Sequence, residues 1–250
     1  MIRWPRAAWR LLRSVAHGLH GLAIVLMRFR SIDAAQREAY IQWWATKMLR
    51  TMGIALRVEG TPQAGGTLMV LNHVSWLDIM AVHAVCPRAR FVSKADVRQW
   101  PLVSRLVDAA GTLYLERERK RDALRVVHVM ASALTAGEMV AVFPEGTTSD
   151  GRALLPFHAN LLQAAIATGA PVQPVALRFS DRYDAVMSRA IEFVGETTLL
   201  QSLWRVAAGD DVVVRVQLLP TVATAGAERR ALSESLRARI GLALDQPALP

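Results

Sequence analysis

The sequence has almost no cysteine and lacks the short motifs that mark several common enzyme classes. A single cysteine, Cys86, among 250 residues excludes an intramolecular disulfide and favours a reducing compartment. There is no Gly-x-Ser-x-Gly elbow, which argues against an ordinary serine lipase or esterase. A Walker loop and a Gly-x-Gly-x-x-Gly turn are also absent, and the six histidines do not fall at zinc-binding spacing. We therefore expect neither a metal site nor a resident cofactor.

The N-terminal quarter of the chain also lacks a long uncharged run. Its longest stretch without Asp, Glu, Lys or Arg covers residues 14–27, which is fourteen residues. As a helix it reaches about 21 Å, less than a hydrocarbon core of about 30 Å. This favours a helix that lies in the membrane interface or re-enters it over one that spans it. A signal peptide is excluded because Arg28 and Arg30 stand where a small-residue cleavage site belongs.

Positive charge is concentrated near the N-terminus. Residues 1–60 contain ten Lys or Arg and three acids, so they supply +7 of the formal net charge of +9. Four of the seven tryptophans lie there too, namely Trp4, Trp9, Trp43 and Trp44. Arginine and tryptophan beside apolar residues suit an anionic membrane surface. Nucleic-acid binding ranks below this interpretation, because the basic residues flank an apolar run instead of forming a polar arm.

A second helix is predicted over residues 33–52, capped by Ser31 or Asp33 and ended by Gly53. Its apolar stripe suits packing on the protein's own core, but we prefer a membrane-docking pair of helices. Beyond residue 54, strands and helices alternate. We expect strands over 55–59, 67–71, 90–93, 112–115, 139–143, 172–179, 191–194 and 212–219. We expect helices over 76–84, 101–109, 119–136, 157–168, 197–207 and 227–244.

This alternation predicts a mixed α/β fold with a mainly β centre flanked by helices. The N-terminal two-helix membrane-docking appendage would occupy residues 1–53, and an α/β domain would occupy residues 54–250.

The most informative stretch is residues 72–78, which follow the apolar strand predicted over 67–71. His73 and Asp78 stand five positions apart, and such a pair can form a general base whose tautomer is fixed by its acidic partner. The alternative is structural. Ser75-x-x-Asp78 fits a helix capping box, with His73 as an ordinary loop residue. The segment alone leaves both interpretations open.

Two further segments end predicted strands with polar residues. Glu145, Gly146 and Thr147 follow the strand over 139–143, and a glutamate there can bind hydroxyls or order the loop. Taken alone, a polar turn is the simpler interpretation. Arg117 follows the strand over 112–115 and could bind an anionic group, although the charge run 116–121 is also typical of a solvated helix start.

In order, four blocks resemble those of the glycerolphosphate and lysophospholipid acyltransferases, in particular the bacterial 1-acyl-sn-glycerol-3-phosphate acyltransferases. The resemblance covers roughly residues 55–220. The blocks are Asn72-His73-x-Ser75-x-x-Asp78, Gly111-x-x-x-x-x-Arg117, Phe143-Pro144-Glu145-Gly146-Thr147 and Pro171-Val172-Gln173-Pro174-Val175. The basic N-terminal helices are also similar to the two-helix membrane motif of that family.

The resemblance implies that His73 takes the proton from a substrate hydroxyl, which attacks a thioester, while Asp78 orients His73. It implies a substrate-binding set made of Asn72, Ser75, Arg117, Glu145, Gly146 and Thr147. The acyl donor would be acyl-CoA or acyl-carrier protein. The partners would then be anionic membrane lipids and a lysolipid acceptor, with no nucleic acid. The location would be the cytoplasmic face of the inner membrane, as a peripheral or monotopic protein.

Two positions depart from the family pattern. Thr148 stands where arginine is common, and His158 stands where lysine is common. This weakens the case for a phosphate monoester and raises a second acceptor, a lyso-ornithine lipid, whose headgroup carries a carboxylate. The leading expectation remains acylation of 1-acylglycerol-3-phosphate to phosphatidate. The more distant alternatives are a non-catalytic membrane-binding module and a lipid hydrolase.

Overall fold

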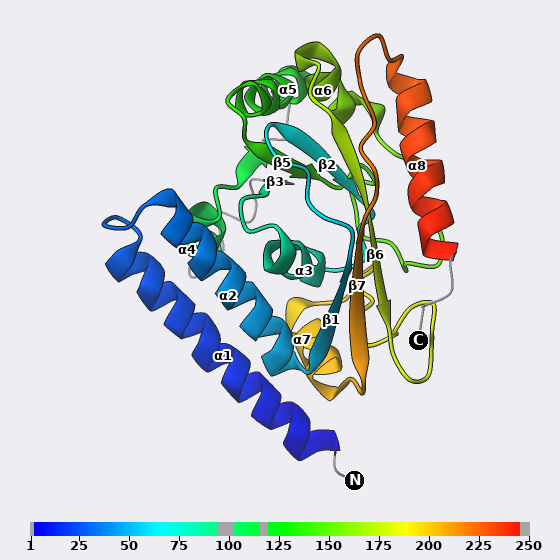
Figure 1. Cartoon of the computed structure of the whole chain (residues 1–250). Helices are drawn as coiled ribbons and strands as arrows, with labels where there is room; N and C mark the ends of the chain where they lie inside the picture. Colours follow the sequence, from blue (N-terminus) through cyan, green and yellow to red (C-terminus); the bar gives the residue numbers. More distant parts are fainter. Residues whose placement is uncertain (1–2, 95–102, 116–119, 246–250) are drawn as a thin grey trace.

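A seven-stranded sheet forms the centre of the chain in the computed structural model, which describes residues 3–94, 103–115 and 120–245 (Figure 1). The strand order is β1-β7-β6-β2-β5-β3-β4. All neighbouring pairs are parallel except β6 and β7, which run antiparallel. The strands are β1 (Ile54–Glu59), β2 (Thr67–Leu71), β3 (Arg90–Lys94), β4 (Leu113–Leu115), β5 (Met139–Val142), β6 (Val172–Ser180) and β7 (Val212–Leu218).

Helices cover both faces of this sheet, which confirms the mixed α/β prediction (Figure 1). The helical elements are α1 (Arg3–Arg28), α2 (Ala34–Met52), α3 (Leu77–Val85), α4 (Val103–Ala109), α5 (Lys120–Thr135), the 3-10 turn η2 (Ala159–Leu162), α6 (Gln163–Thr168), α7 (Leu199–Ala208) and α8 (Arg229–Asp245). The first core cluster joins the sheet to α2, α3 and α7, and the second joins it to α5, α6 and α8. Strand β2 is buried on both faces, which explains its uninterrupted apolar sequence.

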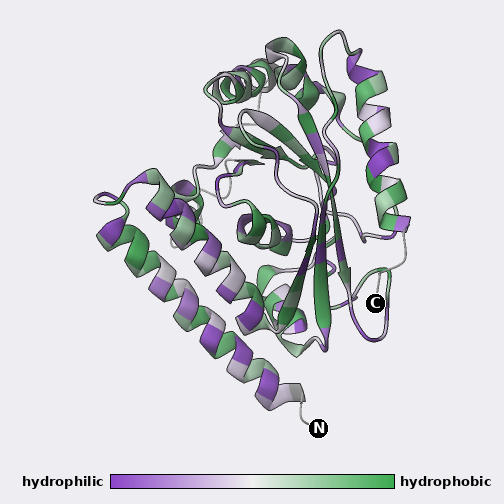
Figure 2. Cartoon of the chain, viewed as in Figure 1, coloured by the Kyte–Doolittle hydropathy of each residue, from purple (hydrophilic) through white to green (hydrophobic). Residues whose placement is uncertain are grey.

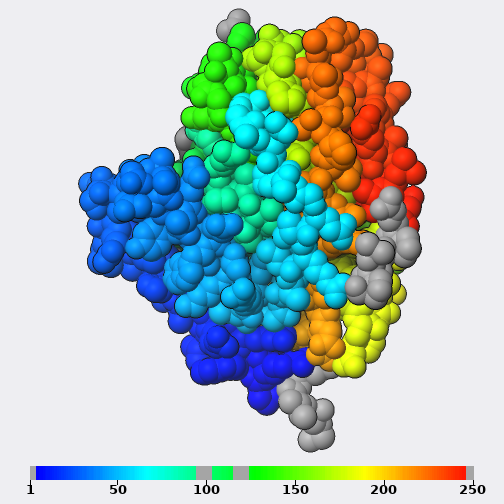
Figure 3. Space-filling view, viewed as in Figure 1, coloured from blue at the N-terminus to red at the C-terminus, as the bar shows by residue number. Residues whose placement is uncertain are grey.

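The two N-terminal helices are joined by specific polar contacts. Asp33 forms a capping box with Gln36 at the start of α2, and Gly53 ends α2 at φ 80°, a left-handed conformation that suits glycine. Ser14 of α1 donates a hydrogen bond to Thr51 of α2 at 3.2 Å. Gly21 lies against the Trp44 indole, where an added Cβ would approach Nε1 to 2.2 Å. These contacts bring α1 and α2 together along one flank of the molecule (Figure 3).

The same helices also pack on the rest of the chain. Arg10 donates to the carbonyl oxygens of Ala207 and Gly209 at the end of α7, at 3.1 and 2.7 Å. Leu49 of α2 is 1% exposed and belongs to the first core cluster. Within the described residues, no helix is long and apolar enough to cross a membrane.

The structure differs from the sequence prediction in two places. Residues 191–194 form no strand, although Ile191 is fully buried; its N–H instead closes a turn on Ser188 at 3.0 Å. The helix predicted over 157–168 begins later, as η2 from Ala159, and becomes α-helical only at Gln163. In both places a short apolar segment is buried by tertiary packing without the backbone that its pattern predicts.

Candidate active site

His73 and Asp78 meet at the carboxyl end of β2. His73 lies two residues after the last residue of the strand, Leu71, and Asp78 lies in the first turn of α3. The Nδ1 atom of His73 is 2.7 Å from Oδ2 of Asp78. Asp78 is fully buried, whereas the His73 side chain is 19% exposed. Among the described residues Nε2 of His73 has no hydrogen-bond partner, so this nitrogen is available to a substrate.

The carboxylate of Asp78 also holds the turn that precedes its own helix. The same Oδ2 atom accepts the backbone N–H groups of Val74 at 2.8 Å and Ser75 at 3.0 Å. Three donors therefore converge on one oxygen, and they hold both the imidazole and the turn that precedes α3. One side chain therefore serves the dyad and this turn, although the N-cap position of α3, Trp76, makes no side-chain cap hydrogen bond.

Glu145 supports the dyad from the neighbouring strand. It follows β5, which lies beside β2 in the sheet, and it is 4% exposed. Its Oε1 accepts the backbone N–H of His73 at 2.7 Å, and its Oε2 accepts that of Leu155 at 2.9 Å. Burial raises the pKa of the Glu145 carboxyl above its usual value, opposed by these two hydrogen bonds and by His73. In this structure Glu145 orders the backbone around the dyad.

Asn72 and Ser75, which the resemblance places in the substrate-binding set, are buried within the fold. The Asn72 amide donates to the carbonyl of Leu177 at 2.9 Å and accepts its N–H at 2.8 Å, so it ties the end of β2 to β6. Ser75 is fully buried, and its hydroxyl accepts the N–H of Leu77 at 3.4 Å. Both side chains lie beside His73 in sequence and fix the turn that presents it.

Gly146 and Thr147 form the turn after Glu145. Gly146 has φ 70°, and its N–H bonds the Phe143 carbonyl at 3.1 Å. Thr147 is exposed. The next residue, Thr148, donates its hydroxyl to the carbonyl of Phe193, so its side chain pins the segment that the sequence predicted to be a strand.

Two further positions that the sequence singled out are His158 and Arg117. His158 is exposed, and its N–H bonds the Pro144 carbonyl at 2.8 Å. Arg117 lies outside the described residues. Within those residues, no group of three or more His, Cys, Asp or Glu is arranged to hold a metal ion.

Sequence reasoning missed two residues that contact His73. The Phe143 ring stacks on the imidazole, with centroids 3.9 Å apart and planes 14° apart. The Ser149 N–H donates to the His73 carbonyl at 2.8 Å. Phe143 stands in the quoted block beside Glu145, so its position was a usable signal. Nothing in the sequence indicated that Ser149, which stands 76 residues after His73, would lie against it.

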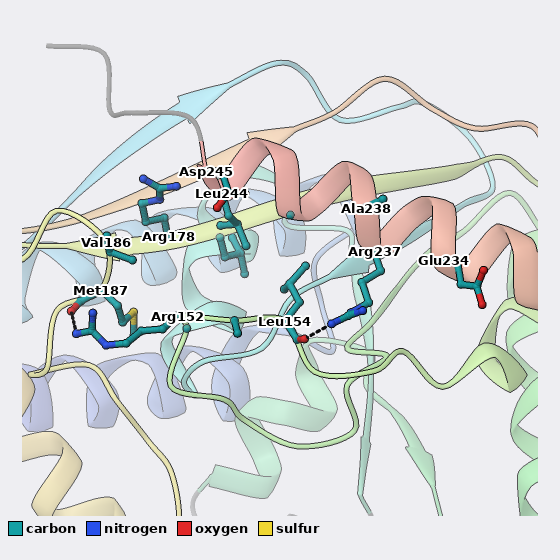
Figure 4. A pocket seen from close by; sticks show the side chains of 14 residues that line it. Arg152, Leu154, Arg178, Val186, Met187, Glu234, Arg237, Ala238, Leu244 and Asp245 are labelled. Atoms are coloured by element: carbon teal, nitrogen blue, oxygen red, sulfur yellow. Dashed lines mark hydrogen bonds between the residues drawn. The ribbon is translucent and has the colours of Figure 1, made fainter.

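A separate pocket of about 440 Å³ lies between α8, β6 and the loop after the Glu145 turn (Figure 4). Its lining includes Leu154, Arg178, Arg237 and Asp245. His73, Asp78 and Glu145 do not line it. The Arg237 guanidinium donates to the Leu154 and Leu155 carbonyls at 2.6 and 3.0 Å. Leu154 lines the pocket and Leu155 donates its N–H to Glu145, so one loop contributes to both places.

A buried carboxylate that orients a histidine with an open Nε2, at the end of a central strand, suits proton transfer to and from a hydroxyl. The acyltransferase family model matches residues 55–178, and the chain belongs to this family of enzymes. The chain is 36% identical to a lyso-ornithine lipid O-acyltransferase from Pseudomonas aeruginosa, over 96% of this chain and 93% of the relative.

Two further comparisons extend this result. The chain is 35% identical to a 1-acyl-sn-glycerol-3-phosphate acyltransferase from Neisseria meningitidis, over 76% of each chain. The crystal structure of the 1-acyl-sn-glycerophosphate acyltransferase PlsC from Thermotoga maritima superposes with a TM-score of 0.65 at 21% identity, covering 96% of this chain and all of that one. That last likeness establishes the fold.

Proposed function

We propose that this acyltransferase moves a fatty acyl group from a thioester donor to the free hydroxyl of a lysolipid. The observation that carries the proposal is the dyad: Nδ1 of His73 is held 2.7 Å from the buried Asp78, and Nε2 has no hydrogen-bond partner in the part of the chain that the structure describes. Family membership supplies the reaction class, and the names of the relatives supply the acceptor class.

In the proposed reaction Nε2 of His73 removes the proton from the acceptor hydroxyl as its oxygen attacks the thioester carbonyl. The tetrahedral intermediate then expels the thiolate, and the thiolate accepts the proton that the imidazolium carries. Asp78 stabilises that imidazolium by charge and fixes its tautomer. The products are the diacylated lipid and the free thiol, and no covalent acyl-enzyme is required.

The leading acceptor is 1-acylglycerol-3-phosphate, which would give phosphatidate. A lyso-ornithine lipid is the second candidate, and two observations favour considering it. A relative that is 36% identical over 96% of this chain carries that name. In addition, Thr148 and His158 replace the cations common in the family, and the Thr148 hydroxyl is already bonded to the Phe193 carbonyl. Arg117 is proposed to bind the anionic headgroup in either case.

The proposed acyl donor is acyl-CoA or acyl-carrier protein, acting as a substrate. The dyad needs no resident cofactor for proton transfer, because an imidazole and a carboxylate suffice for general base catalysis. The two donors differ mainly in the carrier behind the thioester, so a direct comparison of both separates them.

The N-terminal helices are proposed to dock on an anionic membrane surface. Seven large apolar side chains on α1 are between 54% and 73% exposed. Five of them recur at spacings that place them on one side of the helix, namely Trp4, Leu12, Val15, Leu19 and Leu26, and the other two are Trp9 and Met27. Hydrophobic and hydrophilic residues alternate along this helix (Figure 2). An apolar stripe flanked by arginines is typical of a helix lying in the interface.

The proposed location follows from the substrate. A lysolipid acceptor and a soluble thioester donor meet at the cytoplasmic face of the inner membrane. There α1 and α2, in the segment 1–53, would hold the α/β part, residues 54–250, against the headgroups. Peripheral or monotopic attachment fits a surface stripe of this kind.

The test is an acyl-transfer assay on the purified full chain. Both donors are combined with lysophosphatidate and with lyso-ornithine lipid, and the products are identified by mass spectrometry. We expect a diacylated product that requires the acceptor and disappears in His73→Ala. Near wild-type turnover by that variant would rule out the mechanism, whereas fatty acid release without an acceptor would indicate a hydrolase.

A further inference from the structure

The imidazole of His73 is the first of four aromatic rings in a row. Phe143 stacks on it with centroids 3.9 Å apart and an interplanar angle of 14°. Phe91 stacks behind Phe143 at 5.4 Å and 19°. His83 then meets Phe91 edge-on at 5.2 Å and 75°. Phe91 and His83 are 2% and 4% exposed, so the inner end of the row is fixed in the core.

The hydrogen bond to Asp78 leaves one freedom of the imidazole unrestricted. The bond restrains Nδ1, and the backbone restrains Cβ, but the ring can still rock about the line through these two points. Rocking would swing Nε2 away from a bound hydroxyl. A flat contact over one face of the ring removes this motion, since tilting the imidazole would drive it into the Phe143 ring.

We infer that Phe143 is a positioning residue for His73: it sets the plane of the imidazole and stabilises its protonated form. This inference rests on the proposed function. An imidazolium over the face of a phenyl ring is attracted by the ring quadrupole, more strongly where water is excluded. Proton transfer from the acceptor hydroxyl creates this charge on His73, so the contact favours the transition state over the neutral imidazole that precedes it.

Phe91 serves the arrangement indirectly. It does not touch His73 but packs against the far face of Phe143, where it prevents Phe143 from retreating. Position 143 therefore acts on the imidazole directly, and position 91 acts only through position 143. The chain thus offers two matched substitutions, one at the contact and one a single ring away.

The experiment compares Phe143→Leu, Phe143→Tyr and Phe91→Leu with the wild type. For Phe143→Leu we expect kcat to fall about tenfold with little change in KM for the lysolipid. The acid limb of its kcat–pH profile should move to lower pH by about half a unit or more, because the imidazolium has lost its aromatic partner. Phe143→Tyr keeps the ring face and should retain most of both properties.

Phe91→Leu is the control for a general packing defect. It should lower stability while leaving the acid limb where the wild type has it. An equal shift of that limb in Phe91→Leu, or no shift in Phe143→Leu, would overturn the inference. Thermal unfolding of each variant separates a loss of folded protein from a loss of positioning.

A second readout does not depend on activity. In NMR spectra of histidine-labelled protein, the ring protons of His73 should be shifted upfield by the Phe143 ring current, and Phe143→Leu should abolish that shift. Without an upfield shift in the wild type, the stacked arrangement is wrong. If the shift is present but no lysolipid is acylated, the proposed function fails and the arrangement stands.

Discussion

Seven large apolar side chains on α1 lie more than half exposed, whereas Asp78 is completely buried and binds three N–H donors through one oxygen. The exposed side chains of α1 present apolar area that the protein itself does not cover, and few contacts hold them in one position. Asp78 has fixed partners and almost no freedom. A membrane surface, which is fluid, can be met by apolar area and positive charge in many arrangements, whereas proton transfer requires atoms held in place.

The two regions should therefore respond differently to substitution. A single substitution at His73 or at Asp78 should have a large effect on turnover. Changes on the α1 stripe should each be small, and they should add because the side chains act independently. The predictions below test this contrast, beginning with the largest effect.

His73→Ala should reduce kcat by about a thousandfold or more, since it removes the general base. Stability should change by no more than about 1 kcal/mol, because the side chain is partly exposed and Asp78 keeps its two backbone donors. Steady-state kinetics and denaturant unfolding measure the two effects. If His73→Ala is inactive only because it unfolds, the contrast between the dyad and the α1 stripe is contradicted.

Asp78→Asn should reduce kcat by about a hundredfold to a thousandfold and should also destabilise the fold by about 2 kcal/mol. An amide has one acceptor oxygen and a donor NH2 group, so it cannot satisfy His73, Val74 and Ser75 in the same way. The control is Asp150→Asn, an exposed carboxylate near the site. Unchanged stability in Asp78→Asn would contradict the dual role.

His83 should make stability depend on pH. Burial lowers its pKa from 6.5 to about 4, so the folded state keeps it neutral while the unfolded state takes up a proton below about pH 6.5. The free energy of unfolding should therefore fall as the pH drops from 6.5 to 4, by about 3 kcal/mol in all. His83→Leu should lack this component. His128→Gln, an exposed histidine on α5, should retain it.

Leu12→Ser combined with Leu19→Ser should weaken binding to anionic vesicles by about tenfold or more, because two exposed leucines would no longer enter the interface. Turnover on a lysolipid in detergent should stay near the wild-type value. Leu242→Ser on α8 is the control, since that leucine is 67% exposed and α8 lies on the other side of the molecule from α1 (Figure 1). Equal losses in both variants would show that the stripe is not the docking surface.

Arg13→Gln should have the smallest effect, about a fivefold loss on anionic vesicles and almost none on zwitterionic ones. Arg13 is exposed on α1 and follows Leu12 in the chain. Sedimentation with vesicles of the two compositions, each at low and high salt, measures the effect. A loss that is the same on both compositions would point to packing instead of charge.

Much of the fold was predictable because its periodicity is strong. Strand β2 was predicted at Thr67–Leu71, as it stands in the structure, and Asp33 and Gly53 were recognised as the ends of α2. The buried turn at 191–194 was not predicted, because a buried turn and a short strand carry the same apolar pattern. The sheet order, with β6 between β2 and β7, also depends on long-range pairing that spacing does not specify.

The site was partly predictable for a similar reason. His73 and Asp78 are close in sequence, so a local pattern brings them together in space. Glu145 could be nominated by its block, but the sequence did not reveal that its two oxygens bind the backbone at His73 and Leu155. The contacts of Phe143 and Ser149 with His73 arise when parallel strands align their ends, and this alignment is a property of the folded sheet.

The three-way contact at Oδ2 of Asp78 has a practical consequence for trapping complexes. Loss of this carboxylate is expected to remove catalysis and loosen the turn before α3 together, so a protein inactivated there would also be a damaged one. Loss of the His73 imidazole is expected to remove catalysis while Asp78 still holds the turn through Val74 and Ser75. A protein that holds donor and acceptor side by side without reacting, suitable for crystallography or cryo-microscopy, should therefore be made at His73.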